Sequence, residues 1–162
     1  MAKSMKVGDL MATTVEFIDA NATVQDAASL MGELDVSALP IGTPQDLKGV
    51  ITDRDILYRV VAAGRDPRRT PVLQVATKQV YSCQPQDPLS VAMDLMASQN
   101  VRRLPVLDDA QSVIGWITLS DLSRHLLVES EVVQTALHGI TDRIGSNAAE
   151  QGPQVEGDAV TK

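Results

Sequence analysis

The chain has 162 residues, 44% of them hydrophobic and 22% charged, and its formal net charge is −7 at pH 7. A chain of this length can bury a sizeable core without disulfides, and its single cysteine, Cys83, could not form an internal one. The acidic balance and the 2% of aromatic residues argue against nucleic-acid binding, which needs clustered cations and stacking platforms. No stretch approaches the ~18 apolar residues of a membrane span, and no secretory signal is present, so we expect a cytoplasmic protein without a membrane partner.

An internal repeat organises the sequence. Shifting the chain by 65 residues aligns residues 7–40 with residues 72–105 and places one Leu-Pro pair on another. The offset then becomes 66, as if one residue were inserted in a turn, and residues 49–55 fall on residues 115–121. Duplication of one unit explains both alignments.

Each copy shows the same local patterns in chain order. A short apolar stretch (residues 14–18 and 79–83) predicts a strand, and the spacing of the apolar residues in 24–34 and 89–96 predicts a helix. Two short strands follow, at 39–41 and 49–52 in the first copy and at 104–107 and 113–118 in the second. A second helix closes each copy. We therefore predict an α/β protein of the α+β type, with two β-α-β-β-α repeats packed about a pseudo-two-fold axis.

These patterns also set the predicted boundaries. The first repeat covers residues 6–64, a Gly- and Pro-marked linker covers 65–71, and the second repeat covers 72–130. We expect residues 131–144 to extend the last helix. Residues 145–162 are polar and lack periodicity, so we expect a disordered tail there.

The pattern Gly-x-Ile-Thr-x-x-Asp occurs once in each repeat, where a buried strand runs into a helix. Thr52 and Thr118 would lie at helix N-termini, where free backbone N–H groups favour an anion such as phosphate. Asp55 and Asp121 could accept hydrogen bonds from both hydroxyls of a ribose. The same spacing is close to that of a capping box, and the motif in isolation favours this structural interpretation.

With the two Leu-Pro strands, the paired motifs resemble a tandem pair of cystathionine-beta-synthase-type domains, a CBS pair or Bateman module, over about residues 6–129. Proteins of this family are usually regulatory sensors that bind AMP, ADP, ATP, S-adenosylmethionine or NAD in clefts between the two repeats. The resemblance implies two ligand sites. One combines Thr118, Asp121, Arg102 and Arg103 with Thr14, Val15, Val36, Ser37 and Ala38. The other combines Thr52 and Asp55 with Lys78, Val80 and Val101.

Two arginines distinguish these expected sites. Arg102 and Arg103 stand where the first repeat has Ser37 and Ala38, so the two clefts should differ in charge. Arginines at the start of a strand are often only solvated edge charges. Guanidinium groups nevertheless suit phosphate oxygens, and we therefore favour AMP, ADP or ATP over S-adenosylmethionine.

Nothing in the sequence indicates catalysis or a metal site. Cys83, His125 and His138 lack paired ligand spacing, and no nucleophile or oxyanion loop accompanies Asp121 and His125. We expect no catalytic residue, no metal and no cofactor, but a sensor that transmits adenine-nucleotide occupancy to a regulated protein of unknown identity. The alternatives are a constitutive interaction or scaffold module without a ligand, and a module that binds S-adenosylmethionine or NAD.

The closing helices predict self-association. They carry more apolar residues than one small sheet face needs, and members of the resembled family pair through these helices. We therefore expect a two-fold symmetric homodimer. The apolar residues concerned are Ile56, Leu57, Val60, Val61, Leu122, Leu126 and Leu127.

Overall fold

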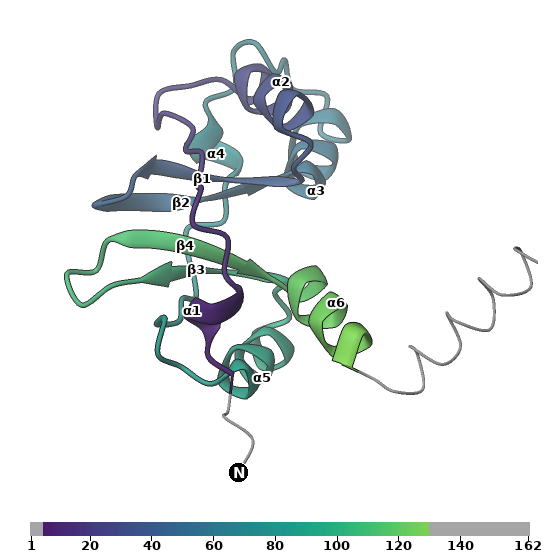
Figure 1. Ribbon diagram of the computed structural model, residues 1–162. Coiled ribbons are helices and arrows are strands. Elements are labelled where there is room, and N and C mark those ends of the chain that lie inside the picture. The colour runs from purple at the N-terminus through teal and green to yellow at the C-terminus, as the bar shows by residue number, and fades with distance from the viewer. Residues whose placement is uncertain (1–4, 130–162) are drawn as a thin grey trace, which may run out of the picture. The chain divides into compact units, whose positions relative to one another are not determined.

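The structure is a computed structural model that describes residues 5–129 of the chain (Figure 1). The chain divides into two units, Met1–Leu122 and Ser123–Lys162, and the strands of both repeats belong to the first unit. The expected helical extension over residues 131–144 and the expected disordered tail over 145–162 lie outside the described residues.

The elements follow one another in the same order in both repeats, with two small antiparallel sheets, so the predicted mixed fold class is confirmed. The first repeat contains α1 (Val7–Leu10), α2 (Val24–Leu34), β1 (Ala38–Thr43), β2 (Asp46–Thr52), α3 (Asp53–Ile56) and a π-helical turn, η1 (Leu57–Val61). The second contains α4 (Val72–Val75), α5 (Leu89–Gln99), β3 (Arg103–Leu107), β4 (Val113–Thr118) and α6 (Leu119–Glu129). In the first unit, Figure 1 shows the β1–β2 sheet next to the β3–β4 sheet, with α2 and α4 on the outer side of the first.

The strand registers reproduce the offsets seen in the sequence. Ala38 faces Thr52 across the first sheet, and Arg103 faces Thr118 across the second. Each sheet also has a register shift at the same place, between Ile41 and Gly42 and between Val106 and Leu107. A position in one repeat therefore has a defined counterpart in the other.

The strands predicted over residues 14–18 and 79–83 are wrong, because each stretch makes only one parallel bridge to a neighbouring strand. Ile18 donates its N–H to the Pro40 carbonyl and accepts from Gly42, and Cys83 bonds to Pro105 and Leu107 in the same way. Continuing either ladder toward the N-terminus would require a backbone N–H from Pro40 or from Pro105, and proline has none. The Leu-Pro pairs that mark the repeat thus also limit its sheets.

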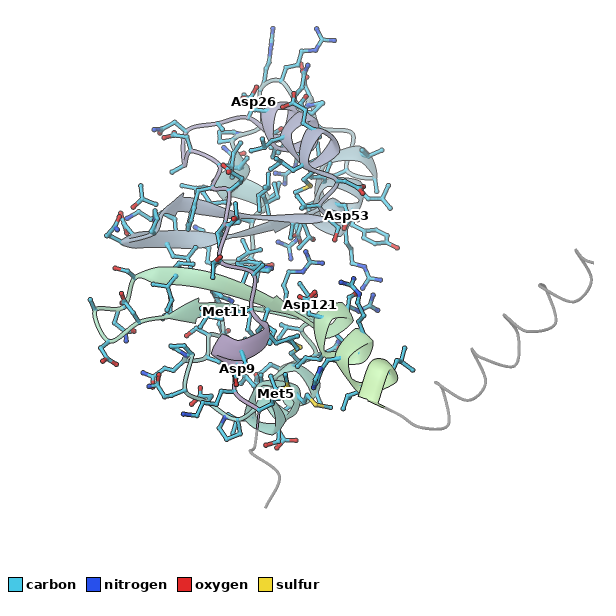
Figure 2. The ribbon with its side chains drawn as sticks, viewed as in Figure 1. Met5, Asp9, Met11, Asp26, Asp53 and Asp121 are labelled. Carbon is cyan, nitrogen blue, oxygen red and sulfur yellow. The ribbon has the colours of Figure 1, made fainter. Side chains whose placement is uncertain are left out.

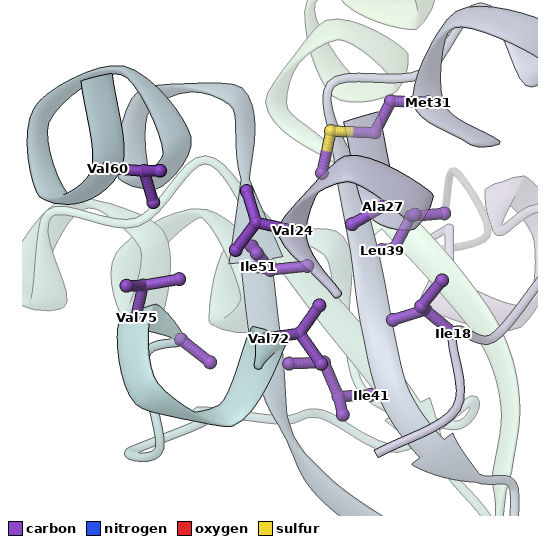
Figure 3. Packing of buried hydrophobic residues seen from close by; sticks show 11 residues of the cluster. Ile18, Val24, Ala27, Met31, Leu39, Ile41, Ile51, Val60, Val72 and Val75 are labelled. Atoms are coloured by element: carbon purple, nitrogen blue, oxygen red, sulfur yellow. The ribbon is translucent and has the colours of Figure 1, made fainter. Parts of the chain in front are cut away.

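Each repeat packs its short first helix into the core of the other. Val72 and Val75 of α4 are fully buried with Val24 and Ile51 of the first repeat (Figure 3). Val7 of α1 is fully buried in the second core. The two repeats are therefore joined by shared hydrophobic burial as well as by the linker.

The glycine that opens each motif allows the chain of the other repeat to come close. A Cβ on Gly49 would lie 2.9 Å from the Thr77 carbonyl oxygen, and a Cβ on Gly115 would lie 2.9 Å from that of Ala12. Val50 and Thr77 exchange two backbone hydrogen bonds at this approach. The segment that follows α4 consequently runs along β2, which helps to form the cavity described next.

Candidate functional site

A cavity of about 700 Å³ lies between parts of the two repeats within the first unit. Its volume falls in the range of small-molecule sites, roughly 300–1,000 Å³. The lining residues come from the end of β2 and the helix after it, from the segment after α4, and from β3 and β4: Val50, Thr52, Asp53, Arg54, Leu57, Tyr58, Thr77, Gln79, Val80, Tyr81, Asn100, Val101, Arg102, Arg103, Pro105 and Trp116. Figure 2 labels Asp53, which stands at the first position of α3 on this cavity.

Thr52 and Asp55 form a complete capping box at the start of α3. The Asp55 carboxylate accepts hydrogen bonds from the Thr52 N–H at 3.0 Å and from the Thr52 hydroxyl at 2.9 Å. The Asp55 N–H in turn donates to the Thr52 Oγ1 at 3.1 Å. The other carboxylate oxygen lies 3.4 Å from Arg59 Nη1. Asp55 is buried, so these partners offset the cost of removing its charge from water.

Thr118 and Asp121 repeat this arrangement at the start of α6. Asp121 accepts from the Thr118 N–H at 3.0 Å and from its hydroxyl at 2.7 Å, and its own N–H donates to Thr118 Oγ1 at 3.2 Å. Both motifs are therefore caps in this structure, as the structural interpretation predicted. A ribose-binding role for the two carboxylates stays a prediction.

The expectation of free backbone N–H groups after Thr52 is wrong. The Asp53 N–H donates to the Ser37 carbonyl at 3.1 Å, and the Arg54 N–H donates to the Asp53 carboxylate at 2.7 Å. The Asp55 N–H is used in the cap. After Thr118, the Leu119 N–H likewise donates to the Arg102 carbonyl at 2.8 Å. An anion near Thr52 would have to be held mainly by side chains.

Three arginines supply positive charge to the cavity wall: Arg54, Arg102 and Arg103. Among residues 5–129, none of the three forms an ion pair with a carboxylate. The acidic residue that lines the same cavity is Asp53. The wall therefore carries a surplus of positive charge.

Arg103 connects the two repeats across the cavity. Its Nη2 donates a hydrogen bond to the Ser37 hydroxyl at 2.9 Å, and Ser37 also holds the start of α3 through its carbonyl. Burial lowers the pKa of the Arg103 guanidinium from its ordinary value, nearby Asp53 raises it, and Arg102 lowers it. The partly buried cation lies beside a second cation, an arrangement that a nearby anion would stabilise.

The cavity gathers part of the predicted Thr52 group. Thr52, Val80 and Val101 line it, whereas Lys78 is exposed beside two lining residues and Asp55 is buried behind the cap. Arg102 and Arg103 line this same cavity, although the resemblance grouped them with Thr118. The reason is that Arg103 extends from β3 toward Ser37 of the first repeat.

The remaining residues of the predicted Thr118 group do not line this cavity. Ser37 is the acceptor of Arg103, and Ala38 pairs with Thr52 in the first sheet. Thr14 and Val36 are exposed and Val15 is half-buried.

Sequence reasoning missed several residues of the cavity wall. Arg54 and Trp116 occupy the variable positions of the two motifs, where no pattern singles them out. Tyr58 lies one helical turn further along, and Asn100 is the left-handed residue that ends α5, with φ of 52°. The repeat offset itself was a usable signal, because it shows which of these side chains differ between the two copies.

Within residues 5–129, no group of three His, Cys, Asp or Glu side chains could hold a metal ion. No helix in that same part of the chain is long and apolar enough to cross a membrane.

Comparison with known proteins adds sequence evidence to this geometry. A sequence model of the CBS domain matches residues 7–62 and 72–128, more than half of the chain. The CBS domain-containing protein YhcV of Bacillus subtilis is 42% identical over 117 residues, which cover 72% of this chain and 82% of that protein.

The solved structures similar to this one include the following two. Hypoxic Response Protein I, solved with two coordinated zinc ions, has a TM-score of 0.67 at 32% identity, covering 75% of this chain and 98% of that chain. The CBS domain pair of protein MJ0100, solved with 5′-methylthioadenosine and S-adenosyl-L-methionine, has a TM-score of 0.71 at 23% identity, covering 79% and 100%. The second similarity concerns the fold alone.

Proposed function

This chain belongs to the CBS-domain family, and we propose that it is a regulatory module that binds an adenine nucleotide, AMP, ADP or ATP. In this proposal it has no catalytic role of its own and needs no cofactor. The ligand's occupancy would be transmitted to a regulated protein partner.

The observation that carries the proposal is the cavity between the repeats. Its volume suits a nucleotide, and its wall combines two kinds of surface. Apolar and aromatic side chains, among them Trp116, Val80 and Val101, offer a surface against which a purine can be buried. The arginines offer planar, permanently charged donors for phosphate oxygens.

The same wall supports a regulatory role. Lining residues come from both repeats, and the Arg103–Ser37 hydrogen bond joins the repeats at this point. A ligand that contacts both repeats, and competes with Ser37 for Arg103, would favour one arrangement of the repeats over another. Such differential affinity is what allows a bound ligand to shift a conformational equilibrium.

Isothermal titration tests the proposal with AMP, ADP, ATP, S-adenosylmethionine and NAD. The MJ0100 complex makes S-adenosylmethionine a necessary member of this panel. We expect saturable heat from at least one adenine nucleotide. A protein that is folded by circular dichroism but gives no saturable heat with any of the five would contradict the proposal.

The capping boxes favour a second candidate, a constitutive interaction module in which both Thr-x-x-Asp motifs are purely structural. Both motifs are satisfied without a ligand. The titration separates the candidates, because a scaffold would show no binding with the whole panel while remaining folded.

We also propose that the protein forms a homodimer. Leu57, Tyr58 and Val61 are exposed on η1, at 53%, 63% and 64%. Leu126 and Leu127 of α6 are exposed at 51% and 53%. Apolar side chains at such exposure, on η1 and separately on α6, are typical of surfaces that a partner covers, and a second copy of the chain is the partner we propose.

A further inference from the structure

The cavity wall is positively charged, whereas the corresponding positions of the other repeat are not. The charged side chains that line it are Asp53, Arg54, Arg102 and Arg103. Three positive charges thus face one negative charge, and among residues 5–129 none of the arginines is paired with a carboxylate within 4.0 Å.

The repeat supplies the comparison. The matching registers of Ala38 with Thr52 and of Arg103 with Thr118 identify the counterpart of each lining position in the other repeat. The four charged positions Asp53, Arg54, Arg102 and Arg103 correspond to Leu119, Ser120, Ser37 and Ala38, none of which is charged.

Two neutral lining residues have acidic counterparts instead. Tyr81 corresponds to Glu16 and Asn100 to Asp35. Asn100 and Asp35 even share a backbone conformation, with φ of 52° and 53° at the ends of α5 and α2. Among the counterparts, the cationic one is Arg124, which corresponds to Tyr58 and belongs to the second unit. The counterpart positions are therefore negative in sum.

We propose that each chain holds one polyphosphate nucleotide, in the Thr52 cavity, and that Arg54 and Arg102 make its affinity depend on the number of phosphates. The counterpart positions in the other repeat disfavour such a ligand, because the acidic residues Glu16 and Asp35 would repel its charge. This inference rests on the proposed function and deepens it by assigning the ligand class and the stoichiometry.

Side chains must carry this selectivity, since the backbone offers little. The N–H groups of Asp53, Arg54 and Asp55 already have acceptors within the protein. The Thr52 hydroxyl donates to Asp55. Charge-assisted bonds from arginine to phosphate are then the main attraction for the anionic part of the ligand, and each added phosphate adds charge for them.

The test compares ATP, ADP, AMP and adenosine on the full chain by isothermal titration. We expect one site per chain for ATP, and affinities that fall from ATP to adenosine by about tenfold or more in total. Raising the salt concentration should weaken ATP binding more than adenosine binding, because screening acts on the charged part alone.

The key variants are Arg102→Ser and Arg54→Ser, which insert the residues that the other repeat carries at these positions, Ser37 and Ser120. Each should lower the ATP affinity by about tenfold and leave adenosine affinity within about twofold. Arg65→Ser is the matched control, because it removes the same charge from an exposed residue outside the cavity and should change neither affinity. Thermal unfolding establishes that each variant is folded.

Three results would overturn the inference while leaving the proposed function intact. They are two equivalent ATP sites per chain, adenosine binding as tight as that of ATP, and an Arg65→Ser effect equal to that of Arg102→Ser. If the folded wild-type protein bound none of the four ligands, and neither S-adenosylmethionine nor NAD, the inference and the proposed function would both be overturned.

Discussion

The acidic residues of both motifs already have structural partners within the protein. Asp55 is 8% exposed and is held by Thr52 and Arg59, and Asp121 is held by Thr118. The sequence predicted these pairs and their helix starts correctly, because Thr-x-x-Asp is a local pattern. It could not say that the neighbouring backbone N–H groups are occupied, since the Asp53 N–H is bonded to Ser37, a residue of another element.

The two motif carboxylates should differ in their effect on binding. Asp55→Asn should lower adenine-nucleotide affinity by about tenfold or more if the carboxylate accepts from a ribose, since a charged acceptor contributes about 1.5–3 kcal/mol. Asp121→Asn should have the smaller effect, because the arginines line the Thr52 cavity. Titration of both variants with ATP measures the difference, and urea unfolding measures any loss of cap stability, about 1 kcal/mol or less.

An unchanged affinity in both variants, together with a loss of stability, would mean that the carboxylates are only caps. The residue-by-residue transfer from the family would then be wrong for this chain.

Cys83 should make stability depend on pH in the alkaline range. Burial, with a smaller contribution from Asp87, raises the pKa of its thiol from 9.0 to about 11. Between these values the unfolded chain loses a proton that the folded chain keeps, so the free energy of unfolding should fall as pH rises from about 9 to about 11. The loss should be on the order of 2 kcal/mol.

Urea unfolding across this pH range measures the slope. The Cys83→Ala variant is the control and should show a shallower fall, whatever its stability at neutral pH. Equal slopes in the two proteins would contradict the assignment to this thiol.

At the scale of elements, each repeat buries a short helix of the other in its hydrophobic core. Each short first helix is buried in the other core, and Gly49 and Gly115 admit the segments that follow these helices. The apolar spacing predicted α2, α5 and the four strands, whose burial patterns are regular over several residues. It could not predict the exchange, because α1 and α4 are only four residues long and carry no periodicity.

Two glycine substitutions should therefore have opposite effects. Gly115→Ala should destabilise the protein by about 1–3 kcal/mol, because the new Cβ would lie 2.9 Å from the Ala12 carbonyl oxygen and must displace backbone. Gly32→Ala should stabilise it by about 0.5–1 kcal/mol, because Gly32 lies within α2 with open space around it. Chemical unfolding of the two variants checks both signs, and destabilisation by both would contradict the argument from close approach.

At the scale of the whole molecule, the exposed apolar side chains of η1 bear on the proposed self-association. The sequence predicted excess apolar residues on this closing helix, and Leu57 and Val61 are indeed exposed while Val60 is buried. The sequence did not predict the π-helical turn at Leu57–Val61, because the apolar spacing was interpreted with the period of an α-helix. In this turn the Ala62 N–H donates to the Leu57 carbonyl, one residue further back than in an α-helix.

A negative charge introduced on the exposed face of η1 should therefore separate the proposed dimer into single chains. Analytical ultracentrifugation at tens of micromolar should give the mass of two wild-type chains. Val61→Glu should shift the mass toward that of one chain, since Val61 is 64% exposed and the monomer fold does not depend on it. Gln74→Glu, an exposed change on α4, is the control and should stay dimeric. A wild-type chain that sediments as a monomer would contradict the proposal.

The sequence by itself determined the duplication, the order of the main elements and the two capping motifs, because each of these is carried by spacing along the chain. The family followed from the resemblance of the paired motifs to those of known proteins. Only the tertiary structure decided which side chains share a cavity. Arg103 pairs with Thr118 in the second sheet, yet its side chain bonds to Ser37, 66 positions away in sequence, and both arginines line the cavity that contains Thr52. Local periodicity records which face of an element is buried, but it carries no information about which distant element that face meets.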